Sequence, residues 1–240
     1  RKIIMKRKVK TKVKGFRTTD GAGVKLVRVL GNLTTKEFDP ILMLDSFDSI
    51  NPDDYTAGFP MHPHRGIETI SYVSRGKMVH RDSLGNEAGI SDGEVQWMNS
   101  GSGIMHEEMV PAAERLLGVQ LWLNLPAKDK MSKPSYNSIK NEDIKEIEIE
   151  GGKIRLLAGK YGEHEGYKGD YLSMDYYDIH LNADAEVTLT MEEDDSVMVF
   201  TLLGDVYIDG EKKKEKTAVK LTEGDSLTIK NGNEKAQVLY

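Results

Sequence analysis

The chain has 240 residues, of which 38% are hydrophobic and 30% charged, with a formal net charge of −6. This length supports one large domain or two small ones with a buried core. Cysteine is absent, which excludes disulfides, thiolate metal sites, iron–sulfur clusters and a cysteine nucleophile. No apolar run approaches the roughly 18 to 20 residues of a membrane helix, and no export signal is recognisable. We therefore expect a cytoplasmic protein that makes no membrane contact.

Residues 1–14 form a basic arm with eight Lys or Arg side chains and no acidic ones, whereas the rest of the chain is acidic in balance. Val9, Thr11 and Val13 alternate with lysines in this arm. That period predicts a strand with one solvated lysine face, and such lysines protect an exposed edge from aggregation. The acidic body argues against general nucleic-acid binding.

Turn signals recur about every eight to twelve residues through most of the chain, a pattern typical of an all-β sandwich or barrel. Helical periodicity is scarce, and the best candidate helix is Asn141–Ile147. The β-rich runs between the turns are Val24–Leu30, Ile67–Val73, Glu94–Met98, Gly118–Asn124, Ile154–Leu157, Asp175–Leu181, Glu186–Met191 and Val197–Leu203.

A polar stretch from about Pro126 to Asn141 divides the chain roughly in half and contains two prolines. Such composition is typical of a linker between domains. We expect an N-terminal domain over residues 1–127, a linker over residues 128–141 and a C-terminal domain over residues 142–240.

The two halves show a faint internal repeat. In the first, Gly93-Glu94 leads into a short apolar run that ends at Asn99-Ser100-Gly101. In the second, Gly224-Asp225 leads into a similar run that ends at Asn231-Gly232. If the repeat is real, it predicts two similar β-barrels in tandem.

Three of the six histidines lie in two short clusters, MHPHRGIE and GIMHEE. His62 and His64 are two residues apart, a spacing that places both side chains on the same face of a strand. His106 and Glu108 have the same relation. We expect these two pairs to face each other inside a barrel and to hold one metal ion with open coordination positions. Open positions are typical of a catalytic site rather than a closed structural one.

The carboxylate of this site is ambiguous from spacing alone. Glu68 has the same parity as His62 and His64, so it competes with Glu108, whereas Glu107 has the opposite parity and is expected to point away. An isolated His-x-His is often a surface pair, but two clusters together favour a metal site. Without cysteine a zinc deaminase is excluded, and without HExxH a zincin is excluded.

Four motifs occur in order along the chain: HPHRGIET at 62–69, HRDSLGN at 80–86, GEVQWM at 93–98 and GIMHEE at 103–108. Together with FDP at 38–40 and LDSF at 44–47, they resemble the pirin family of the cupin superfamily. The strong resemblance covers roughly residues 38–125, and a weaker similarity continues through the second half.

The resemblance implies an all-β bicupin, with two tandem cupin (jelly-roll) β-barrels and a metal site in the N-terminal barrel only. It assigns the ligand roles to His62, His64, His106 and Glu108, and so favours Glu108 over Glu68. The family metal implied is iron, and we expect one mononuclear Fe(II), with Mn, Ni, Zn or Cu also suited to these donors.

Two functions follow from the resemblance. The first is an oxygenase of the quercetin 2,3-dioxygenase type, which opens a flavonol ring with O2 and releases carbon monoxide. The second is a non-enzymatic, redox-responsive iron protein that binds a protein partner, as a transcription cofactor does, and it would suit a nuclear location. We favour the oxygenase, with a flavonol-like aromatic substrate, Glu108 as the catalytic base and a monomeric chain.

Outside the ligand set, His80 and Asp82 share strand parity and carry groups that could orient a ligand. An ordinary hydrogen bond at a hairpin explains this pair equally well. Arg65, next to the first histidine cluster, is expected to meet an internal carboxylate.

Overall fold

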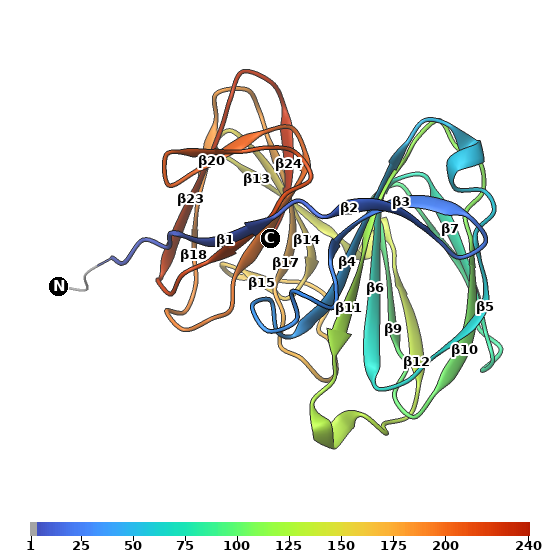
Figure 1. The fold of residues 1–240 in the computed structure, drawn as a ribbon. Coiled ribbons are helices and arrows are strands. Elements are labelled where there is room, and N and C mark those ends of the chain that lie inside the picture. Colours follow the sequence, from blue (N-terminus) through green and yellow to red (C-terminus); the bar gives the residue numbers. More distant parts are fainter. Residues whose placement is uncertain (1–3) are drawn as a thin grey trace. The chain divides into compact units, whose positions relative to one another are not determined.

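The computed structural model describes residues 4–240, which form an all-β chain with two compact units (Figure 1). The histidine unit comprises residues 15–144 and 169–173, and the C-terminal unit comprises residues 4–14, 145–168 and 174–240. Each unit contains a seven-stranded and a four-stranded sheet, and all strand pairs within these sheets are antiparallel. The expected all-β class with two sheet-rich halves is confirmed.

In the histidine unit the large sheet has the order β12-β9-β6-β11-β4-β3-β2, and the small sheet has the order β5-β10-β7-β8. Its strands are β2 (Phe16–Asp20), β3 (Val24–Leu30), β4 (Ile41–Ser49), β5 (Phe59–His64), β6 (Ile67–Arg75), β7 (Lys77–Asp82), β8 (Glu87–Ser91), β9 (Glu94–Asn99), β10 (Ile104–Met109), β11 (Leu116–Asn124) and β12 (Ser135–Ile139).

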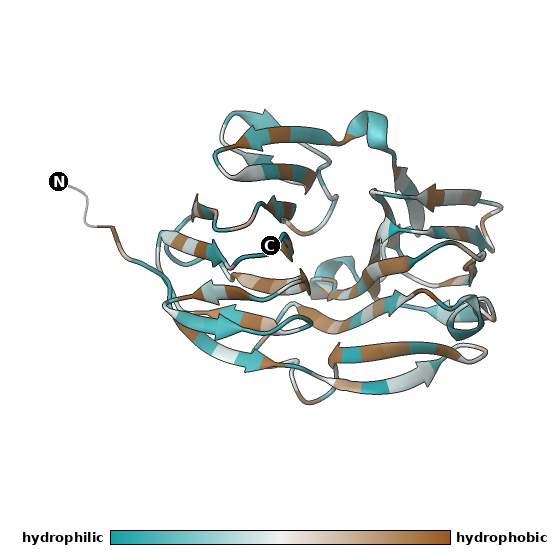
Figure 2. Ribbon diagram, turned by 90° about the horizontal axis from the view of Figure 1, so that it is seen from above, coloured by the Kyte–Doolittle hydropathy of each residue, from teal (hydrophilic) through white to brown (hydrophobic). Residues whose placement is uncertain are grey.

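Alternating side chains explain why these segments form strands and which face each strand buries. In β10, Ile104, His106 and Glu108 are buried, whereas Met105 and Met109 are exposed. This period of two is that of a sheet with one covered face. Figure 2 shows the same alternation of hydrophilic and hydrophobic residues along many strands. The small sheet therefore directs its polar, metal-compatible side chains inward.

The C-terminal unit repeats this architecture, with sheets ordered β1-β22-β19-β24-β17-β14-β13 and β18-β23-β20-β21, and a separate β15-β16 hairpin. Its core is a cluster of aliphatic residues with Tyr177. Its strands are β1 (Val9–Val13), β13 (Lys145–Ile149), β14 (Gly152–Ala158), β15 (Lys160–Tyr161), β16 (His164–Glu165), β17 (Tyr176–Leu181), β18 (Glu186–Thr190), β19 (Met198–Leu203), β20 (Val206–Ile208), β21 (Glu211–Lys213), β22 (Ala218–Leu221), β23 (Ser226–Asn231) and β24 (Ala236–Leu239).

In the described part of the basic arm, Val9–Val13 forms the strand that its alternation predicted, and this strand, β1, pairs with β22 at the edge of the C-terminal sheet. Just before it, Arg7 is buried and donates hydrogen bonds to the carbonyl oxygens of Gly224, Thr222 and Glu192 at 2.8, 3.1 and 2.9 Å. A guanidinium with several carbonyl acceptors is well satisfied inside a protein. The start of the chain therefore groups with its end, a long-range pairing that local sequence patterns do not reveal.

The middle of the chain differs from the sequence-based picture. The stretch 128–141, expected as a linker, contains β12, which pairs with β9 from Ser135↔Asn99 to Ile139↔Val95. The helix expected over Asn141–Ile147 is wrong, because this segment is a 3-10 turn, η3 (Asn141–Asp143), followed by β13. Pairing with β14 overrides the weak local helix signal.

The other helical segments of residues 4–240 are also single 3-10 turns, η1 (Pro52–Asp54) and η2 (Ala127–Asp129). Within this described part, no helix has the length and apolar character needed to cross a membrane.

Candidate metal centre

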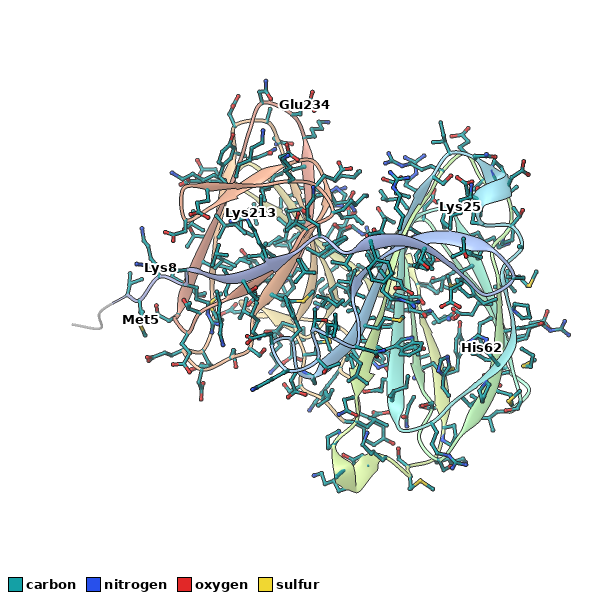
Figure 3. The ribbon with its side chains drawn as sticks, viewed as in Figure 1. Met5, Lys8, Lys25, His62, Lys213 and Glu234 are labelled. Carbon is teal, nitrogen blue, oxygen red and sulfur yellow. The ribbon has the colours of Figure 1, made fainter. Side chains whose placement is uncertain are left out.

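The histidine clusters lie on two neighbouring strands of the small sheet, β5 and β10. His106 pairs directly with His62, and Ile104 pairs with His64. The two pairs of side chains were expected to face each other inside a barrel, and they do so from adjacent strands of one sheet. Adjacent strands lie only about 4.8 Å apart, so this register brings the imidazoles together without help from the opposite wall. His62 is labelled in Figure 3, in the region where Figure 1 labels β5 and β10.

Three imidazole nitrogens converge at this point. Nε2 of His62 lies 3.1 Å from Nε2 of His64 and 2.9 Å from Nε2 of His106. Burial, reinforced by the neighbouring imidazoles, lowers the pKa of His64 to about 4 and that of His106 to about 3. A neutral imidazole keeps one lone pair, which is the form that binds a metal. His64 and His106 therefore need no deprotonation at neutral pH.

Glu108 lies beside the histidines, with Oε1 3.6 Å from Nε2 of His106. The carboxylate is 2% exposed and accepts hydrogen bonds from Nε2 of Gln96 at 2.9 Å and from Nε2 of Gln120 at 3.1 Å. These amide donors compensate for burial of the carboxylate. Glu108 is thus oriented at the edge of the histidine triad.

The competing candidate, Glu68, and the neighbouring Glu107 have other partners. Oε2 of Glu68 accepts a hydrogen bond from Trp97 Nε1 at 2.7 Å, and burial raises the pKa of Glu68 above its ordinary value. The shared strand parity of His62, His64 and Glu68 does not hold, because β5 ends at His64 and the chain turns at Gly66, which has a φ of +71°. Glu68 therefore lies on the next strand, β6. Glu107 points away from the triad, as its parity predicted, and its carboxylate lies 3.7 Å from Arg81.

A second pair of polar residues supports the triad from β7. Nδ1 of His80 lies 3.3 Å from Nδ1 of His106, and Nε2 of His80 lies 2.7 Å from Oδ2 of Asp82. The pair was singled out by parity, and β7 places it directly next to His106 and Glu108 in register. Arg65 was expected to meet a carboxylate, but it donates to the carbonyl oxygen of Ser102 at 2.9 Å.

The donor set fits a single metal ion. Each of His62, His64 and His106 offers a ring nitrogen, and these nitrogens lie within 4.8 Å of one another. Three imidazoles with a nearby carboxylate suit first-row divalent metals such as iron, manganese, nickel or zinc. In the C-terminal unit, His180 bonds instead to Asp178 and His164 lies exposed on β16. The histidine triad therefore lies in the N-terminal half of the chain, as expected.

Comparisons with known proteins identify the family of this chain. Residues 23–123 match the family model Pirin. Human pirin is 34% identical over 238 residues, which cover 95% of this chain and 79% of the human protein. The chain belongs to the pirin family.

One relative in sequence and one similar solved structure carry the name of an enzyme. A Pseudomonas aeruginosa protein with the provisional name quercetin 2,3-dioxygenase is 39% identical over 227 residues, which cover 90% of this chain and 80% of that protein. The crystal structure of quercetin 2,3-dioxygenase from Acinetobacter baumannii superposes with a TM-score of 0.87 at 29% identity, covering 98% of this chain and 86% of that one.

Several residues that support this pirin site were not singled out from the sequence. Gln96 and Gln120 hold Glu108, Tyr136 stacks on His80 with ring centroids 4.0 Å apart, and Trp122 lies edge-on to His64 at 5.2 Å. A detectable signal existed for the glutamines, since each interrupts an otherwise apolar strand run. Tyr136 gave no such signal, because it lies in the stretch that was expected to be a linker.

Proposed function

We propose that this pirin-family protein is a metal-dependent oxygenase of the quercetin 2,3-dioxygenase type, acting on a flavonol-like substrate with O2. The proposed ligands of one Fe(II) are His62, His64, His106 and Glu108. The observation that carries the proposal is the convergence of three imidazole nitrogens beside a carboxylate that two side-chain amides hold in place. The fold and the identity shared with the named Acinetobacter enzyme add support for the reaction type.

A bound divalent ion would supply Lewis acidity and a template for orienting the substrate. The residues of the chain have separate roles. His62, His64 and His106 present lone pairs from a rigid sheet, and Glu108 is the carboxylate positioned to accept the proton of a flavonol hydroxyl at its Oε1. The indole of Trp122, edge-on to His64, offers an aromatic surface for a planar ring.

The experiment is anaerobic loading with Fe(II), followed by addition of O2 and quercetin. Turnover is expected as a loss of flavonol absorbance with release of one carbon monoxide per substrate. Parallel loading with Mn, Ni, Zn and Cu identifies which metal supports the reaction.

The matched variants are His62→Ala, which removes a proposed ligand, and His164→Ala, which removes an exposed histidine of the C-terminal unit. Turnover should be lost in the first and kept in the second. If loaded wild type gives no carbon monoxide with any metal, or if His62→Ala turns over like wild type, the oxygenase proposal fails.

A further inference from the structure

Asp82, His80 and His106 form a continuous hydrogen-bonded chain that ends at the histidine triad. The side chains of all three are fully buried. The chain runs from Oδ2 of Asp82 to Nε2 of His80 at 2.7 Å, and from Nδ1 of His80 to Nδ1 of His106 at 3.3 Å. Nε2 of His106 then faces Nε2 of His62 at 2.9 Å. The position of each proton along this chain follows from what the partners can donate.

Asp82 fixes the first proton. Its Oδ1 accepts the backbone N–H groups of Leu84 and Asn86 at 2.9 and 3.1 Å, and its Oδ2 also accepts from Nδ2 of Asn86 at 2.9 Å. A carboxylate only accepts hydrogen bonds, so Nε2 of His80 carries the proton between them.

The remaining protons follow in sequence. With one proton on the His80 ring, as the proposal requires, protonation of Nε2 leaves a lone pair on Nδ1, so Nδ1 of His80 accepts and Nδ1 of His106 donates. His106 is then left with a lone pair on Nε2, the atom that faces the other imidazoles. Nδ1 of His62 lies 2.7 Å from the carbonyl oxygen of Pro60, which can only accept a hydrogen bond. His62 therefore also carries its proton on Nδ1 and has a lone pair on Nε2.

We propose that Asp82 and His80 are positioning residues, which hold His106 in the tautomer whose Nε2 is free to bind the metal. This inference rests on the proposed metal centre but not on the proposed reaction. Partners of this kind fix the tautomer and ring orientation of a metal-binding histidine, and their loss typically lowers metal affinity by about 10- to 100-fold. Tyr136 stacks on His80 at an interplanar angle of 12° and holds its ring in the required plane.

The decisive variant is Asp82→Asn, which keeps the shape of the side chain. The backbone N–H groups of Leu84 and Asn86 require an acceptor at the Oδ1 position, so the amide oxygen must lie there and the amide NH2 must face His80. The side-chain amide of Asn86 can turn over to accept from it. His80 is then protonated on Nδ1, and His106 must move its proton to Nε2, where the proton blocks the metal site.

Two measurements test this reversal. Nitrogen-15 NMR of the metal-free protein should show His80 protonated on Nε2 and His106 on Nδ1 in wild type, and both assignments reversed in Asp82→Asn. Competition with a chelator should show Fe(II) or Zn(II) affinity roughly 10- to 100-fold weaker in the variant. The matched control is Asp92→Asn in the β8–β9 turn of the same unit, where Asp92 accepts the N–H of Gly76 and is expected to leave both readouts unchanged.

A second pair of variants separates tautomer control from packing. His80→Gln can donate to Asp82 and accept from His106, so metal affinity should stay near that of wild type. His80→Phe keeps a ring against Tyr136 but offers no acceptor, so affinity should fall as in Asp82→Asn.

Three results would overturn the proposal: a wild-type His106 protonated on Nε2, a wild-type His80 protonated on both nitrogens, or equal metal affinity in Asp82→Asn and wild type. None of these measurements uses quercetin. Absence of flavonol cleavage would therefore refute the proposed reaction and leave the positioning role to be judged on its own data.

Discussion

Around Glu108, each hydrogen-bonding group is oriented by a further partner. Oε1 of Gln96 accepts from the Tyr136 hydroxyl at 3.2 Å, and Oε1 of Gln120 accepts from Trp122 Nε1 at 3.3 Å. Each amide oxygen is thereby fixed, so each NH2 group faces the carboxylate. Two oriented amides satisfy the buried carboxylate of Glu108 and fix its direction toward the histidines.

The variant Gln120→Leu tests this arrangement. It removes one donor to a buried carboxylate and one to Ser71 Oγ, so the free energy of unfolding should fall by roughly 1–3 kcal/mol. Metal affinity should fall about tenfold, as for other groups that orient a ligand. The control is Gln237→Leu in the C-terminal unit, which removes a buried donor to Asp178. Equal loss of stability in the two variants is acceptable, but equal metal affinity would contradict the role given to Gln120.

At the scale of elements, β10 organises the site. It pairs with β5 on one edge, where His106 lies opposite His62, and with β7 on the other, where Glu108 lies opposite His80. One strand thus connects the proposed ligands to the residues that orient them. Since a shift of β10 by one residue would turn His106 and Glu108 to the outer face, the site depends on this pairing as much as on residue type.

Strand β12 contributes to the site through Tyr136, which contacts both supporting networks. Tyr136→Ala should lower the free energy of unfolding by roughly 2 kcal/mol and weaken metal binding, because His80 and Gln96 both lose a contact. Tyr136→Phe keeps the stacked ring and loses only the hydroxyl contacts, at a cost of about 1 kcal/mol. Chemical denaturation and chelator competition on both variants provide the check. Wild-type metal affinity in Tyr136→Ala would show that β12 is structural only.

For the whole molecule, the two units share an architecture but differ in their interiors. The main hydrophobic cluster of the C-terminal unit is aliphatic apart from Tyr177, whereas the histidine unit directs imidazoles, amides and a carboxylate inward from β10 and its neighbours. Among the residues that the structure describes, the one group of side chains that could hold a metal ion is this triad, and it lies in the histidine unit. Metal binding should therefore stabilise one unit and not the other.

Calorimetry with and without metal tests this asymmetry. A ligand at about 100 times its Kd stabilises the state that binds it by about 2.7 kcal/mol, so the transition of the histidine unit should move to higher temperature and return on chelation. The transition of the C-terminal unit should not move. His62→Ala should abolish the shift, and a shift that persists in this variant would place the metal elsewhere.

The sequence by itself determined the fold class, the family and the three histidines that form the candidate metal-binding group. Turn spacing and a period of two report directly on strands, and the HPH and MHEE motifs lie within single strands, where parity holds. The basic arm was also read correctly as a strand, because alternation is a local property of the chain.

Tertiary structure decided the surroundings of the histidines and the pairing of distant segments, because both depend on which strands become neighbours. Parity could not separate Glu68 from Glu108, since the turn at Gly66 moves Glu68 to another sheet. The pairing of β12 with β9 and of β1 with β22 joins segments far apart in sequence, so composition alone suggested a linker for the first and gave no partner for the second. The direction of the protons from Asp82 to His106 arises only when β7 and β10 lie side by side, because hydrogen bonds between strands have no signature along the chain.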